Sequence, residues 1–294
     1  MSDPVRTLNT PAGPRHYLLH EPPGQGRTPR PLVLFLHGAG GTAAWALDET
    51  RWPHTADREG FFLLTPEGSR ADPHRPAGFL HNPQAWSDGS PPGQVGHLRV
   101  DDVGFVAALL DEVCGNWPVD PRRVYVTGFS NGAALAFRLG AELSERFAAL
   151  APVCGVCWAE RPRPAVARPT LYLVGAADPL VPLDGGTVVN LWGDGPMSRP
   201  PVWDSVRTWA AALGCPATPA AIEERDEAEV RVYRPGRDGS ELQVWIVRGH
   251  GHHWPGGRGQ LSRRLFGPPA HDVRANDLIW GFFRSHPQDK PGSR

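Results

Sequence analysis

Residues 124–139 read VYVTGFSNGAALAFRL, and this stretch decides the predicted fold. A run rich in β-branched and aromatic residues meets Gly128-Phe129-Ser130-Asn131-Gly132, and a helix-forming segment follows. The five residues fit the pattern G-x-S-x-G, in which a sharp turn from strand to helix exposes a serine hydroxyl. Glycines suit both flanking positions because larger side chains there would crowd the turn. In the simpler alternative, Ser130 only caps the helix in a glycine-rich turn.

The rest of the chain alternates apolar strands with amphipathic helices. Continuous apolar runs, typical of strands covered on both faces, occupy residues 31–37, 61–66, 147–155 and 170–176. Helical spacing is found at residues 101–117, behind Asp101 or Asp102 as N-cap, and at residues 202–213 and 271–285. Residues 229–249 read as a strand pair that turns at Arg237-Asp238-Gly239. This order predicts an α/β fold, with a doubly wound, mostly parallel sheet and helices on both faces.

We expect one domain in this chain of 294 residues. Residues 1–30 should form a hairpin and loop of that domain, residues 31–286 its main part with the candidate site, and residues 287–294 a tail. Residues 69–99 lack periodicity and are rich in Pro, Gly, His and Trp, so they predict a long functional loop.

Composition and charge exclude several classes of protein. Hydrophobic residues make up 40% of the chain and charged residues 21%, which favours a globular protein with a substantial core. The net charge is −1, and no basic block interleaves with aromatic residues, so neither a nucleic acid nor a membrane partner is expected. The first 19 residues contain no apolar leader, which favours a cytoplasmic protein, or a secreted one if a leader was removed. The oligomeric state is left open.

Four cysteines are too few for a disulfide scaffold in a chain of this length. Cys154-Gly-Val-Cys157 has the spacing of a redox or zinc motif, but no second cysteine pair completes a structural zinc site. We therefore expect buried thiols there. A disulfide between Cys114 and Cys215 stays open as an alternative.

A serine nucleophile needs a carboxylate and a histidine, which follow the serine in this order in such folds. Asp178 lies just beyond the carboxyl end of the strand TLYLVGA, where open α/β sheets hold their sites. The alternative is an aspartate that forms a turn before Pro179. Other aspartates are less attractive because none closely follows a strand: Asp184, Asp194 and Asp204.

The base should come from VWIVRGHGHHWPGG, residues 244–257, which ends a strand in a loop with His250, His252 and His253. The His-x-His-His run could instead offer two metal ligands, but no carboxylate or cysteine lies nearby in the sequence. A solvated histidine loop without function is the third possibility.

The oxyanion of an acyl transfer reaction needs two hydrogen-bond donors. The backbone N–H of Asn131, at the start of the predicted helix, is one candidate. The other is the backbone N–H of Ala39, which follows His37-Gly38 in the loop after the first central strand. A phosphate cradle is disfavoured because this loop lacks the Lys and Ser/Thr of a P-loop.

These motifs together resemble the polyhydroxybutyrate depolymerase and feruloyl esterase group of α/β-hydrolases, which is similar to carbohydrate esterase family 1. The resemblance runs from PLVLFLHGAGG and VDDVGFVAALLDEV through APVCG and GAADPLVPLDGG to GHHWPGG and ANDLIWGFFRSHP. It implies that the base is His252, in a Gly-His-x-Trp-Pro-Gly run, and that the acid is Asp178. His250 stands where the group is expected to have glycine, which leaves a shift of the base by one step open. Many members of the group are secreted.

The resemblance implies a serine esterase without cofactor or metal that acts on hydroxyalkanoate, feruloyl or related polyester and aryl esters. Trp45, Trp86 and Trp254 are candidates for substrate contact, since they are close in sequence to the candidate site or lie in the long loop. Packing in the core is the alternative for each of them, and the commoner role of a tryptophan. The tryptophans on predicted helices are expected in the core: Trp203, Trp209 and Trp280. A serine peptidase or amidase, and a non-catalytic binding protein, are the alternatives.

Overall fold

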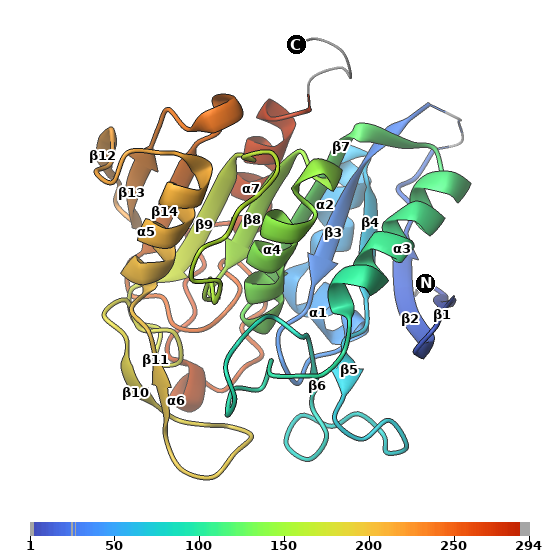
Figure 1. Cartoon of the computed structure of the whole chain (residues 1–294), viewed down its shortest axis with the longest axis horizontal. Coiled ribbons are helices and arrows are strands. Elements are labelled where there is room, and N and C mark those ends of the chain that lie inside the picture. The colour runs from blue at the N-terminus through green and yellow to red at the C-terminus, as the bar shows by residue number, and fades with distance from the viewer. Residues whose placement is uncertain (1–2, 25, 27, 289–294) are drawn as a thin grey trace.

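A ten-stranded sheet forms the centre of the protein in a computed structural model that describes residues 3–24, 26 and 28–288 (Figure 1). Its strands, in their order across the sheet, are β1 (Val5–Thr10), β2 (Gly13–His20), β4 (Phe62–Pro66), β3 (Arg30–Leu36), β7 (Val119–Phe129), β8 (Ala149–Val153), β9 (Thr170–Gly175), β14 (Leu242–Val247), β13 (Ala228–Tyr233) and β12 (Ala221–Glu224). The strands from β4 to β14 run parallel, while the pairs at both edges are antiparallel.

Helices cover both faces of the sheet. One face carries α3 (Asp102–Asn116), α4 (Asn131–Glu142) and α5 (Val202–Leu213), and the other carries α1 (Ala43–Thr50), α2 (Trp52–Glu59) and α7 (Ala275–Ser285) (Figure 1). Alternate residues of the central strands face the two cores; on β3, Leu34 and Leu36 join the first core, and Val33 and Phe35 the second. The predicted α/β class and the two helical layers are confirmed.

The order of the central strands places the candidate site. The chain passes from β3 outward to β4 and then returns to β7 on the other side of β3. Ligands of open α/β sheets bind at such a reversal, beyond the carboxyl ends of the strands. The pairing continues to Leu36 on β3 and Gly128 on β7, so the segments that follow both strands leave the sheet side by side.

Loops and short elements cover this carboxyl edge. They include the hairpins β5 (Ser69–Arg70) with β6 (Gln84–Ala85) and β10 (Gly186–Val188) with β11 (Met197–Arg199), and the short helix α6 (Arg263–Phe266). Two 3-10 turns lie elsewhere: η1 (Ser144–Arg146) and η2 (Arg237–Gly239). The predicted loop of residues 69–99 thus contains only β5 and β6 as regular strands.

Some predicted boundaries are wrong. The last helix begins at Ala275 and not at residue 271. Val273 is buried before the helix begins. The domain boundaries stay predictions, and residues 289–294 of the expected tail lie outside the described residues. No helix in the described part of the chain is long and apolar enough to cross a membrane.

Candidate active site

Ser130 occupies a strained turn between β7 and α4. Its backbone has φ 55° and ψ −116°, which is unusual for a residue with a side chain, and its N–H donates to the carbonyl of Val153 (2.9 Å). A Cβ atom added to Gly132 would lie 2.3 Å from the carbonyl oxygen of Leu36, and one on Gly128 would lie 2.5 Å from that of Gly132. Both glycines of the motif are therefore required by close backbone packing.

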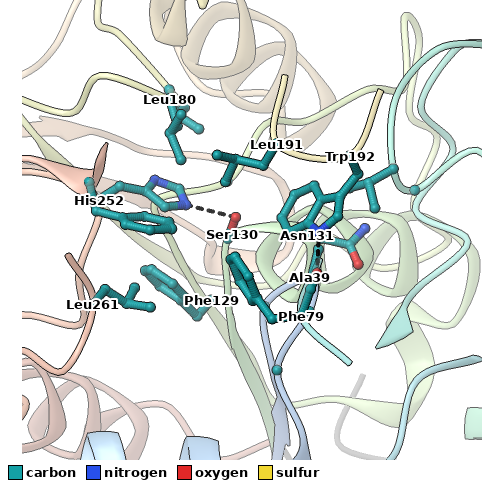
Figure 2. Close-up of a pocket in the computed structure, with 18 of the residues that line it drawn as sticks. Ala39, Phe79, Phe129, Ser130, Asn131, Leu180, Leu191, Trp192, His252 and Leu261 are labelled. Carbon is teal, nitrogen blue, oxygen red and sulfur yellow. Dashed lines mark hydrogen bonds between the residues drawn. The ribbon is translucent and has the colours of Figure 1, made fainter. Parts of the chain in front are cut away.

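His252 joins Ser130 to Asp178. Its Nε2 lies 2.8 Å from the Ser130 hydroxyl oxygen (Figure 2). Its Nδ1 lies 2.7 Å from Oδ2 of Asp178. The three side chains follow the carboxyl ends of β7, β9 and β14, as the parallel arrangement of these strands requires. The structure thus brings together all three residues named from the sequence.

Asp178 is held rigidly below the imidazole. Its second oxygen, Oδ1, accepts hydrogen bonds from the backbone N–H groups of Leu180 and Val181, each at 2.8 Å. The residue is only 5% exposed, so these donors compensate for the hydration that the carboxylate loses on burial. The sequence offered a turn before Pro179 as the alternative role of Asp178. The side chain does bond to the backbone of this turn, and it also contacts His252.

The two neighbouring histidines have structural contacts. The ring of His250 is fully buried; its Nδ1 accepts from the N–H of Ala270 (2.8 Å), and its Nε2 donates to the carbonyl of His253 (3.0 Å). His253 in turn donates from Nε2 to the carbonyl of Gly267 (2.9 Å). Burial lowers the pKa of His250 to about 4, so it is neutral at pH 7. These contacts leave neither nitrogen of His250 free to bind a metal or a hydroxyl.

Cys154 lies directly beside the histidine and the acid. In the described part of the chain, Cys154, Asp178 and His252 form a group whose possible ligand atoms lie within 4.8 Å of one another. Burial, with a smaller effect of the nearby Asp178, raises the pKa of the Cys154 thiol well above its usual value. A protonated thiol and an imidazole already bonded on both nitrogens are poor metal ligands.

All four cysteines are free, so the alternative of a disulfide between Cys114 and Cys215 is wrong.

The loop after β3 lies against the serine. A Cβ on Gly38 would come within 3.4 Å of the Ser130 Cβ, so the backbone of this loop approaches Ser130 closely. The N–H groups of Gly40 and Gly41 donate to the carbonyls of Gln84 (2.8 Å) and Gly38 (3.1 Å). Ala39, whose N–H is the candidate oxyanion donor, lines the cavity in front of Ser130.

The side chain of Asn131 holds the long loop against the site. Its Oδ1 accepts from the N–H of Trp86 (2.7 Å), while its Nδ2 donates to the Trp86 carbonyl (3.0 Å) and to Oδ2 of Asp88 (2.6 Å). The Trp86 indole N–H then donates to the carbonyl of His37 (2.9 Å). Through these bonds the long loop, the start of α4 and the loop after β3 are fixed relative to one another.

A cavity of about 530 Å³ opens in front of Ser130. Its walls are mostly apolar, and Figure 2 shows Leu180, Leu191, Leu261 and Trp192 around the serine and histidine. Trp192 also donates its indole N–H to the carbonyl of Phe79 (2.5 Å), which links the long loop to the loop between β10 and β11.

Of the three tryptophans that are candidates for substrate contact, only Trp45 lines this cavity. Trp86 is fully buried by the contacts described above, and Trp254 packs against Phe35 and donates to Oδ1 of Asn276 (2.8 Å). The candidate substrate contact of Trp86 and Trp254 is therefore corrected to a role in packing. The sequence interpretation missed other lining residues, which lie in segments without periodicity: Phe79, Trp158, Leu191, Trp192 and Arg199.

Comparison with known proteins identifies the family of this chain. A family model described as "Esterase PHB depolymerase", where PHB is polyhydroxybutyrate, matches residues 15–197. The chain belongs to this esterase family. It is 33% identical over 265 residues to a candidate esterase, NocK, of Nocardia uniformis subsp. tsuyamanensis, with 83% of this chain and 71% of NocK covered. It is 25% identical to feruloyl esterase B of Piromyces equi, covering 76% of this chain but only 39% of that protein.

Solved structures identify the fold independently. The acetyl xylan esterase of Aspergillus awamori superposes with a TM-score of 0.61 at 16% identity, covering 95% of this chain and 99% of that one. At this identity the likeness shows the α/β-hydrolase fold and leaves the substrate open. The esterase family and this fold therefore agree with the resemblance found in the sequence.

Proposed function

We propose that this esterase is a serine hydrolase of carboxylic esters, with Ser130 as nucleophile, His252 as base and Asp178 as the acid that orients it. The observation that carries the proposal is the pair of contacts made by His252, 2.8 Å to the Ser130 hydroxyl and 2.7 Å to Asp178. With Nδ1–H donated to the carboxylate, Nε2 is the unprotonated nitrogen that can accept the serine proton.

The reaction has two steps of acyl transfer. Ser130 attacks the ester carbonyl while His252 takes the hydroxyl proton, and the backbone N–H groups of Ala39 and Asn131 stabilise the oxyanion. When the intermediate collapses, the carbon–oxygen bond to the alcohol breaks and His252 gives its proton to the leaving oxygen. Water then attacks the acyl-serine, again with His252 as base, and the acid is released with Ser130 restored.

The cavity and the named relatives support a proposal for the substrate class. The apolar and aromatic walls of the cavity, which include Trp45, Phe79 and Trp192, suit a short hydroxyalkanoate chain or an aryl acyl group. Named relatives include feruloyl esterase B of Piromyces equi and poly(3-hydroxyalkanoate) depolymerase C of Paucimonas lemoignei. We propose hydroxyalkanoate, feruloyl and related polyester or aryl esters as substrates of this protein, which needs no cofactor for the reaction.

Replacement of Ser130 by alanine tests the proposal. Purified wild type and Ser130→Ala are assayed against p-nitrophenyl acyl esters, methyl ferulate and hydroxybutyrate oligomers. We expect turnover by the wild type and a loss of about 10⁴-fold or more in kcat for the variant, because no other group replaces the nucleophile. Ser69→Ala, which changes a serine that does not line the cavity, serves as the matched control and should keep full activity.

An anilide of the same acyl group distinguishes the peptidase or amidase alternative. Faster hydrolysis of the anilide than of the ester would favour that alternative. A wild type inert on every ester, or a fully active Ser130→Ala, would contradict the proposal and return attention to a binding role.

A further inference from the structure

Arg199 is an unusual member of the cavity wall. Among the described residues that line the cavity, only Asp88, Arg199 and the base His252 carry ionisable side chains. Arg199 ends β11, and its guanidinium lies 5.6 Å from the ring centroid of Trp158, another lining residue. A permanent positive charge therefore faces a site whose other walls are mostly apolar.

Only some of the guanidinium N–H donors of Arg199 bond to other described residues of the protein. Its Nε donates to the carbonyl of Leu180 (3.2 Å), and one terminal nitrogen donates to the side-chain oxygen of Gln94 (2.7 Å). An arginine has five N–H donors, so these two bonds leave donors for a ligand. Both partners are neutral, and no carboxylate of the described residues forms an ion pair with Arg199 within 4.0 Å.

Asp88, the other charged residue of the wall, is engaged elsewhere. Its Oδ1 accepts from the N–H of Ser90 (2.9 Å) and its Oδ2 from Nδ2 of Asn131 (2.6 Å). A Cβ on Gly96 would lie 2.2 Å from the carboxylate, so this side of Asp88 is closed by backbone. Its hydrogen bonds hold the long loop. Asp88 and Asp178 both attract the guanidinium of Arg199 through space, but neither forms a contacting ion pair with it, so its open N–H donors stay available to a ligand.

We propose that Arg199 binds the free carboxylate of an ester substrate, so that the enzyme prefers short hydroxy-acid oligomers with an ionised carboxyl end. This inference rests on the proposed ester hydrolysis at Ser130 and narrows its substrate class. A partly buried cation with open donors gains most from a bidentate carboxylate, which matches the planar fork of the guanidinium. The Leu180 contact places Arg199 beside the segment that holds Asp178, so a substrate bound there lies next to the triad.

The wild type alone gives the first test. Hydrolysis of the 3-hydroxybutyrate dimer and trimer is compared with that of the same oligomers ending in a carboxamide, which differ in charge but hardly in size. We expect kcat/KM to be about 10- to 100-fold higher for the carboxylates, the range typical of hydrogen bonds to charged groups. An equal or lower kcat/KM for the carboxylates would overturn the inference without the need for any variant.

Substitutions then assign the preference to Arg199. In Arg199→Leu the ratio of kcat/KM between carboxylate and carboxamide should fall to about one, and in Arg199→Lys it should be intermediate because the charge stays but the fork is lost. Arg161→Gln changes an exposed arginine that does not line the cavity, and its ratio should equal that of the wild type. A general loss of activity from disturbed loops would lower both rates and leave the ratio unchanged, so it cannot imitate the expected result.

Neutral p-nitrophenyl butyrate separates this inference from the proposed function. If the wild type hydrolyses it but shows no preference for carboxylates, or keeps the preference in Arg199→Leu, only the role of Arg199 is wrong. If the wild type hydrolyses no ester, the proposed function fails and the inference fails with it.

Discussion

The hydrogen bonds of single side chains distinguish reactive from structural residues in this site. His250 and His252 lie two positions apart on one loop, but His250 bonds only to backbone groups and His252 joins a hydroxyl to a carboxylate. The proposed role of His252 as base therefore depends on contacts with residues 74 and 122 positions away in the chain.

Asp178→Asn should inactivate the enzyme without unfolding it. The amide oxygen can still accept from the N–H groups of Leu180 and Val181, but an Asn no longer stabilises the imidazolium and permits the wrong tautomer of His252. We expect kcat to fall by about 10³–10⁴-fold with little change in the thermal unfolding midpoint. Asp184→Asn, at an exposed aspartate of the same segment, is the control. A kcat within tenfold of wild type would show that Asp178 does not orient the base.

The buried neutral His250 should make stability depend on pH. Its pKa is lowered to about 4 in the folded protein, so the unfolded chain binds a proton more readily below pH 6.5. The contribution of neutral His250 to the free energy of unfolding is fully present above pH 6.5. About 2–3 kcal/mol of it is lost as the pH falls towards 4. Urea unfolding of wild type and His250→Gln between pH 7.5 and 4.5 measures this. At pH 7.5 the free energy of unfolding of His250→Gln should be lower than that of the wild type, but it should fall less as the pH is lowered. The control His54→Gln, at an exposed site, should show the same pH dependence as the wild type. Parallel curves for wild type and His250→Gln would refute this account.

Residue types alone could predict some of these roles. Ser130 and Asp178 could be found because each follows a strand of recognisable pattern. The residues left the choice among His250, His252 and His253 open, and the resemblance to the esterase group selected His252. The burial of Trp86 and Trp254 could not be predicted, because a tryptophan has the same sequence signal whether it lines a cavity or packs in a core.

Among the elements, the turn from β7 to α4 is the most constrained. Its glycines let the start of α4 contact the end of β3. A Cβ atom added to Gly132 would lie 2.3 Å from the Leu36 carbonyl oxygen and 2.5 Å from that of His37, which is too close for any side chain. These carbonyls belong to buried backbone at the last residue of β3 and the residue directly after it, and moving them would disturb close packing.

Gly132→Ala should therefore destabilise the fold and disturb the serine. We expect a loss of about 1–3 kcal/mol in the free energy of unfolding, together with reduced kcat, because relief of the clash shifts the elbow. The matched control is Gly281→Ala on α7, where an added Cβ would meet no atom within 4 Å. That change should be neutral or stabilise the protein by up to about 1 kcal/mol. Equal stability of both variants in urea unfolding would contradict this reading of the motif.

Elements with a strong period were predictable, and those formed by tertiary contacts were not. β7, α4, α3 and α5 follow their apolar patterns closely. The sequence interpretation did not name the helices α1 and α2, each eight residues long. Helices this short depend on docking for their stability, so their sequences alone predict them poorly. In α2 that docking places Trp52 in the core, against Phe35 and Phe61.

At the scale of the whole molecule, function depends on the convergence of distant segments. Parallel strands β7, β9 and β14 end at one edge of the sheet, and the loops after them deliver Ser130, Asp178 and His252 to one point. The long loop and the β10–β11 hairpin then close the cavity through Trp192 and Arg199. The sequence predicted the convergence because the serine, the acid and the histidine each follow a predicted strand, in this chain order. It could not place the covering loops, which lack periodicity and are fixed by tertiary contacts such as those of Trp192 and Arg199.

Covalent labelling of the folded protein tests the central claim most directly. A fluorophosphonate reacts with a serine only where a base activates it, so the account predicts one adduct, on Ser130, with activity lost in proportion to labelling. Labelling should disappear in Ser130→Ala and fall sharply in His252→Ala. Peptide mapping by mass spectrometry reads the position. An adduct on another residue that abolishes ester hydrolysis, or undiminished hydrolysis after complete modification of Ser130, would contradict the assignment of Ser130 as the nucleophile.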